Sequence, residues 1–182
     1  MNRLLMLAAA LLVQETKPQP AYPTSQWEIW QGFGEGSSTT LVIESGGEKT
    51  EITTTLIKRE KDQITLESVM KEKGGTKPAE QRVVTPPPKA EAPAVDGDCS
   101  HCKKPMKDHK KPLTVDGTEK ITIGDQKIDC LKRELTSYDC DGKAEMTSTT
   151  WYSSSVPGFM VKGEKKTGEK TVKVTCTAFV KR

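Results

Sequence analysis

Apolar and polar residues alternate along two long stretches of this chain, which is the pattern of strands with one buried face. In the first stretch, Leu41 to Ile43, Ile52 to Ile57 and Ile64 to Val69 are rich in Ile, Val and Thr. A Gly46-Gly47 break and a charged turn at Arg59 to Gln63 separate them. β-Branched residues favour strands, and breaks about every ten residues predict an antiparallel meander.

The second stretch ends in the clearest strand of the chain. Before it, Ile121 and Ile123 alternate into a turn at Gly124-Asp125, and Val156-Pro157-Gly158 marks a further turn. In the last strand one face is apolar and the opposite face is mostly polar. Its apolar face consists of Val172, Val174, Cys176, Ala178 and Val180. A sheet with one solvent-exposed face is typical of antiparallel pairing.

The fold class predicted from these patterns is mainly β, a curved antiparallel sheet or half-barrel. We expect two β blocks, residues 21–70 and 113–182, to form one domain. Residues 71–112 hold seven of the 11 prolines and many lysines, so this segment is expected to be a linker or long excursion that interrupts the sheet. No stretch after residue 20 shows an apolar stripe at helical spacing that is long enough for a core helix.

Residues 1–20 have the order of parts found in a signal peptide. Met1-Asn2-Arg3 is a short positive head, Leu4 to Val13 is apolar, and a polar, proline-containing stretch follows. Ten apolar residues are about half of what a membrane-spanning helix needs, so no stable membrane span is expected. The sequence therefore predicts a secreted or periplasmic protein.

The charge balance adds little to this picture. The net charge of +3 is a small difference between 28 basic and 25 acidic residues that are interspersed along the chain. Such a balance does not indicate a nucleic-acid binder.

Five cysteines would enter an oxidising compartment if the chain is exported, and there disulfides persist. We expect disulfides among Cys99, Cys102, Cys130 and Cys176. Cys99 and Cys102 can close a small bridge, and a bridge between Cys130 and Cys176 would leave Cys140 as the odd thiol. Connectivity does not follow from sequence alone, and Cys130 and Cys176 are equally suited to be small core residues.

The motif Cys99-Ser100-His101-Cys102 is the local pattern with the most chemical content. Besides a disulfide, two thiols at this spacing can form a redox couple or half of a tetrahedral zinc site. The candidate metal ligands are Cys99, Cys102 and His109, with Cys130 or Cys140 as the fourth. The leading expectation is that the protein has no cofactor, and zinc is the alternative.

A motif near the end of the chain resembles a known group of proteins. Trp151 to Gly158 follows the pattern W-x-S-x-x-V-P-G, with Val161-Lys162 after it. This resembles a strand and turn of exported bacterial β-sheet proteins of unknown function, which are similar to half-barrels of the lipoprotein-carrier type. The resemblance implies an antiparallel sheet that wraps an apolar concavity, and it implies little about function, because one fold hosts many functions.

The sequence shows no catalytic constellation. There is no nucleophile elbow, no phosphate-binding loop that follows a strand and opens a helix, and no paired-histidine metal motif. We therefore expect a non-enzymatic exported β protein that binds an apolar ligand or an envelope partner. Trp27, Trp30 and Trp151 are the candidate ligand-binding residues. The alternative is a thiol-redox or zinc-binding module centred on the C-x-x-C motif.

Overall fold

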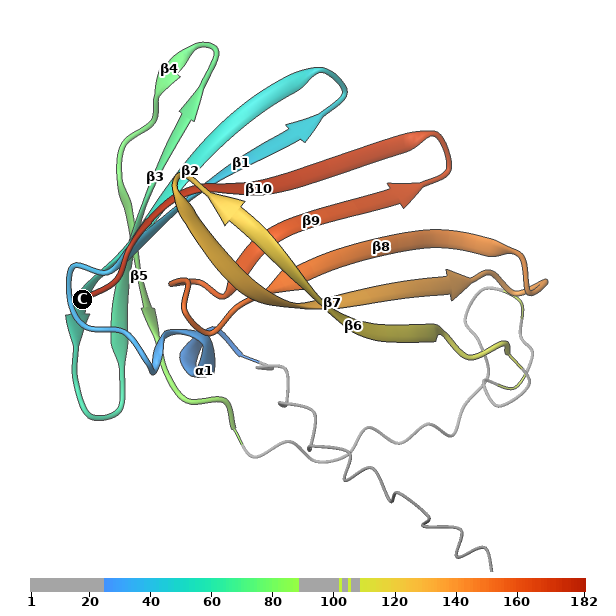
Figure 1. Ribbon diagram of the computed structural model, residues 1–182, viewed down its shortest axis with the longest axis horizontal. Helices are drawn as coiled ribbons and strands as arrows, with labels where there is room; N and C mark the ends of the chain where they lie inside the picture. The colour runs from blue at the N-terminus through green and yellow to red at the C-terminus, as the bar shows by residue number, and fades with distance from the viewer. Residues whose placement is uncertain (1–24, 89–101, 103–104, 106–108) are drawn as a thin grey trace, which may run out of the picture.

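The structure is a computed structural model that describes residues 25–88, 102, 105 and 109–182. The described elements are α1 (Gln26–Trp30), β1 (Ser38–Ser45), β2 (Glu48–Arg59), β3 (Ile64–Glu72), β4 (Gly75–Thr76), β5 (Glu80–Val84), β6 (Leu113–Ile123), β7 (Gln126–Tyr138), β8 (Ala144–Tyr152), β9 (Met160–Thr167) and β10 (Lys170–Val180). The ten strands form one antiparallel sheet in the order β4-β3-β2-β1-β10-β9-β8-β7-β6, and β5 also pairs with β3 (Figure 1). The predicted mainly β, antiparallel fold is confirmed.

The first and last strands of the sequence lie side by side near the middle of the sheet. β1 pairs with β10 from Ser38 opposite Val180 to Ser45 opposite Val172. This pairing joins the strands of the two predicted β blocks. The sheet is open, because β4 and β5 lie at one end of the strand order and β6 at the other.

Strands extend further into the predicted linker than the sequence indicated. β4 and β5 both lie within residues 71–112, and β5 pairs with β3 from Glu80 opposite Ser68 to Val84 opposite Ile64. The proline-rich composition concealed them. Arg82-Val83-Val84 is compatible with a strand, and the run of three prolines starts only at Pro86.

The sheet curls over itself at the β6–β7 hairpin, which crosses in front of β9 and β10 (Figure 1). The apolar tip of this hairpin, with Ile123 and Ile128, packs in one buried cluster with Val161 of β9 and Cys176 of β10. Cys130, Trp151 and Val156 complete that cluster. Curvature therefore gives the strands a buried face without a second sheet.

A second buried cluster lies under the short helix α1. Ser25 and Glu28 form a capping box that starts the helix. Trp30 and Phe33 then pack against Leu56 of β2 and Leu66 of β3. A helix of five residues is too short for a periodic apolar stripe, which is why the sequence pattern did not reveal it. It is the longest helix among the described residues, and none there is long and apolar enough to cross a membrane.

The glycine-rich stretch between α1 and β1 forms hydrogen bonds with Arg182, which follows β10. The Gly34 amide donates to the carbonyl of Arg182 over 2.7 Å, and the Arg182 amide donates to Ser37 Oγ over 2.9 Å. A Cβ atom on Gly34 would lie 2.9 Å from the Arg182 oxygen, so only glycine allows this approach.

Candidate metal centre

The turn between β7 and β8 positions one of the predicted thiols. Asp139 organises this turn, because its side-chain Oδ1 accepts from the amides of Asp141 (3.0 Å) and Lys143 (2.9 Å). The Gly142 amide donates to the Asp139 carbonyl, and Gly142 has a φ of 77°. Cys140 is thereby held in a tight turn at the end of the β7–β8 hairpin.

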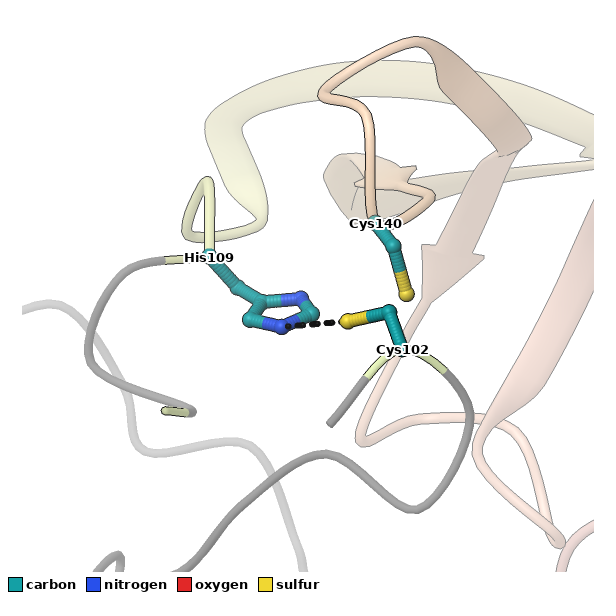
Figure 2. Close-up of side chains that lie close together, drawn as sticks. All are labelled: Cys102, His109 and Cys140. Carbon is teal, nitrogen blue, oxygen red and sulfur yellow. Dashed lines mark hydrogen bonds between the residues drawn. The ribbon is translucent and has the colours of Figure 1, made fainter. Parts of the chain in front are cut away.

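Two more predicted residues meet Cys140 there. Cys102 and His109 come from the segment between β5 and β6, and Cys102 Sγ lies 3.4 Å from His109 Nε2 (Figure 2). The possible ligand atoms of Cys102, His109 and Cys140 all lie within 4.8 Å of one another, and all three residues are half-buried. The structure therefore brings together side chains from two distant parts of the sequence.

The donor atoms suit a soft or borderline transition metal. Zn²⁺ binds thiolates at about 2.3 Å and imidazole at about 2.0–2.1 Å, so tetrahedral ligand atoms lie about 3.5–3.8 Å apart. The separation of 3.4 Å between Cys102 and His109 matches this spacing. The three possible ligand atoms lie within 4.8 Å of one another, which exceeds this spacing by at most about 1 Å.

The sequence predicted Cys102 and His109 as ligands and left Cys130 and Cys140 as alternatives for a further one. Of these two, it is Cys140 whose thiol lies near Cys102 and His109. No sequence signal chose between them, although Asp141-Gly142 marked the turn beside Cys140. Cys99 lies outside the described residues, so its role as a ligand or disulfide partner stays a prediction.

The predicted disulfide between Cys130 and Cys176 is not formed, because both are free thiols. Cys130 lies on β7 and Cys176 on β10, and β8 and β9 separate these strands in the sheet. Each residue is 3% exposed and packs in the cluster of the β6–β7 tip. They are core residues, which was the other interpretation of their alternating positions. Cys102 is also a free thiol in this structure.

Burial changes the acidity of the two core thiols. Desolvation is the main cause that raises the pKa of Cys130 to about 11, and the neighbouring charges of Asp129 and Glu119 act in the same direction. Desolvation also raises the pKa of Cys176, although hydrogen bonds to Thr39 and Ala178 oppose the shift. Both thiols therefore stay protonated and poorly nucleophilic at neutral pH.

The three predicted ligand-binding tryptophans are divided between the two buried clusters. Trp30 is 2% exposed under α1, and Trp27 packs beside the same cluster. Trp151 is 7% exposed in the other cluster, and its Nε1 donates to Glu119 Oε2 over 2.7 Å. The structure does not bring the three side chains together, and Trp30 and Trp151 are held by the core of the protein itself.

Comparison with known proteins gives a distant likeness in fold. No protein-family model matches this sequence, and no curated protein matches it. A Bacteroides fragilis structure, described as that of an exported protein with a YmcC-like fold, is 11% identical with a TM-score of 0.45, over 82% of this chain and 97% of that one. The hypothetical lipoprotein YmcC from Escherichia coli is 15% identical with a TM-score of 0.33, over 81% and 88%. Similarity at this level assigns neither a site nor an activity.

Proposed function

We propose that this protein is an exported, non-enzymatic β-sheet protein in which Cys102, His109 and Cys140 bind one zinc ion. The observation that supports this is the convergence of the three ligand atoms within 4.8 Å of one another. The ion links the segment that precedes β6 to the β7–β8 turn, so it cross-links the two ends of the β6–β7 hairpin. Its role is structural.

The stabilising effect of zinc follows from the separation of its ligands in the sequence. Cys102 and His109 precede the β6–β7 hairpin and Cys140 follows it. The unfolded chain does not hold these three groups together, so zinc binds the folded chain preferentially. Preferential binding to the folded state raises its stability by mass action.

Two features of the sequence support the remainder of the proposal. The segment from Met1 to Val13 has the pattern of an export signal. The chain has only two histidines, and the described one, His109, lies in the cysteine cluster. A histidine that binds zinc is not free to act as a general base, which argues against a serine-histidine hydrolase.

Zinc titration of the reduced, metal-stripped protein tests the proposal. We expect one zinc ion per chain by native mass spectrometry. In competition with a chromophoric chelator, Cys140→Ser should weaken binding by at least about a hundredfold, the upper end of the losses caused by outer-shell substitutions. The matched control is Cys130→Ala, which removes a thiol outside the cluster and should leave the affinity unchanged.

Three results would contradict the zinc proposal. One is that the reduced protein binds no zinc, and another is that Cys140→Ser and Cys130→Ala bind it equally well. The third is a protein isolated after export that lacks zinc, is lighter by two hydrogens and contains a disulfide between Cys102 and Cys140. In that case the cluster would be a disulfide clip.

A further inference from the structure

β6 is a long edge strand of the described sheet. It runs for 11 residues, from Leu113 to Ile123, and among the described strands it pairs only with β7. Edge strands present unpaired backbone amides and carbonyls to solvent, and proteins commonly protect them by making them short, by placing proline in them or by placing charged side chains on them. The opposite end of the sheet follows this rule, because β4 has two residues, β5 has five, and Pro86 to Pro88 come soon after β5. β6 contains no proline.

The apolar face of β6 is only half covered. Leu113, Val115, Ile121 and Ile123 share one face, since side chains of a strand alternate. Ile123 is buried in the core and Ile121 packs against it. Leu113 and Val115 are 54% and 51% exposed, among the most exposed large apolar side chains of the described chain. The apolar side chains at the Leu113 end of β6 are therefore exposed, whereas those at the Ile123 end are packed in the core.

The sequence of β6 is self-complementary when two copies pair antiparallel. If a second copy of β6 pairs antiparallel about Thr118, Val115 faces Ile121 and Leu113 faces Ile123 of the other copy. On the opposite face, Asp116 lies across from Lys120. Each exposed apolar residue thus meets an apolar residue, and Asp116 meets the oppositely charged Lys120, while Glu119 faces Gly117.

Existing ion pairs continue this charge pattern into the next strands. Within one chain Arg133 of β7 is directly opposite Asp116, and its Nε and Nη2 bind the two carboxylate oxygens at 2.8 and 2.9 Å. Asp129 of β7 is directly opposite Lys120, at 2.6 Å. Pairing about Thr118 would therefore place Arg133, Asp116, Lys120 and Asp129 in one row across four strands, with alternating charges.

Neighbouring registers lack this complementarity. Pairing about Gly117 would place Val115 opposite Glu119, and pairing about Glu119 would oppose two copies of that carboxylate. Like charges directly opposite each other destabilise a sheet, and opposite charges and apolar pairs stabilise it. One register is thus strongly preferred.

We propose that two copies of this protein associate through β6, antiparallel and with a two-fold axis at Thr118. The two sheets then become one continuous sheet, and the edge backbone groups of each β6 find partners. The interface is isologous, so every contact occurs twice. This inference does not depend on the zinc proposal, since none of the metal ligands lies on β6.

Sedimentation equilibrium of the purified protein tests the association. A single-strand interface is small and gives weak binding, so the protein concentration should extend to about 1 mM. We expect a monomer–dimer equilibrium. Lys120→Glu would place a carboxylate opposite Asp116 at two symmetric positions and should raise the dissociation constant by about tenfold or more. The matched control is Lys127→Glu, an exposed β7 position with the same charge change, which should leave the constant unaltered.

Cross-linking tests the register. Directly opposite residues of antiparallel strands have Cβ atoms about 4.5–5.5 Å apart, so Thr118→Cys should form an intermolecular disulfide with its own copy. Thr122→Cys would face Thr114 and should cross-link no more than the parent protein. A mixture of the Thr114→Cys and Thr122→Cys proteins should form mixed dimers.

The association would be overturned if the parent protein remained monomeric at the highest concentration. Equal dimerisation of the Lys120→Glu and Lys127→Glu proteins would show that another surface is used. Cross-linking of Thr118→Cys at the level of the parent would exclude the register centred on this residue. If zinc binding fails and dimerisation persists, only the metal proposal falls.

Discussion

Arg59, at the end of β2, holds helix α1 against the sheet. Its guanidinium donates to the carbonyl of Gln31 over 2.9 Å through Nη1, and to the carbonyls of Trp30 and Phe33 over 2.6 and 2.5 Å through Nη2. These contacts fix the backbone that carries the side chains of Trp30 and Phe33 into the core. We expect Arg59→Met, which keeps an unbranched apolar stem, to destabilise the protein.

The expected loss follows from the hydrogen bonds. A hydrogen bond contributes about 1 kcal/mol net, and up to about 3 kcal/mol with a charged donor. Because these bonds are exposed or only partly buried, we take the lower value, which gives about 3 kcal/mol for three bonds. Arg59 Nε is buried without a partner among the described residues, so its removal recovers about 1 kcal/mol. The free energy of unfolding should fall by about 2 kcal/mol.

Urea denaturation followed by tryptophan fluorescence measures this loss. The matched control is Arg82→Met. Arg82 is exposed on β5, and among the described residues its guanidinium donates to the exposed side chain of Gln26. The control should change stability by no more than about 0.5 kcal/mol. If Arg59→Met changed stability as little as the control, the carbonyl contacts would not be what holds α1.

Two further predictions concern the core. Leu66 is fully buried, so Leu66→Ala should lower the free energy of unfolding, measured by urea denaturation, by about 3 kcal/mol. Val83 is 59% exposed, so the control Val83→Ala should lower it by under about 1 kcal/mol. Equal losses would contradict the assigned core. The pKa of Cys130 is raised from 9.0 to about 11, so below pH 9 the folded protein should have about a hundredfold less thiolate at this residue than the unfolded chain. Cys130 should therefore resist iodoacetamide until the protein unfolds, which peptide mass mapping can check. The folded chain keeps this proton between pH 9 and about 11 while the unfolded chain loses it, so stability should fall as pH rises through that range. Rapid labelling of the folded protein would refute both statements.

Local patterns in the sequence determine most of the strands and their buried faces. The alternation from Val172 to Val180 predicts the final strand, which is β10, because side chains of a strand point alternately to the two faces. The predicted apolar face was wrong after Cys176, because the register of pairing with β1 shifts there, so that Phe179 packs against the core and Val180 is 48% exposed. Glycine pairs and proline-glycine turns mark where strands end. The pattern fails where an element is short or its composition is unusual, as in α1 and β5.

Most neighbouring strands are consecutive in the sequence, as the predicted meander requires, but the pairing of the two β blocks was decided only by the tertiary structure. β1 and β10 lie far apart in the sequence, and their pairing depends on long-range packing that no local pattern contains. The same limit applies to the candidate metal centre. The sequence supplies thiols and an imidazole of the right chemistry at Cys102 and His109. Curling of the sheet buries Cys130 in the core, and the β7–β8 turn places Cys140 beside Cys102 and His109, so folding of distant segments decides which thiol joins the candidate centre.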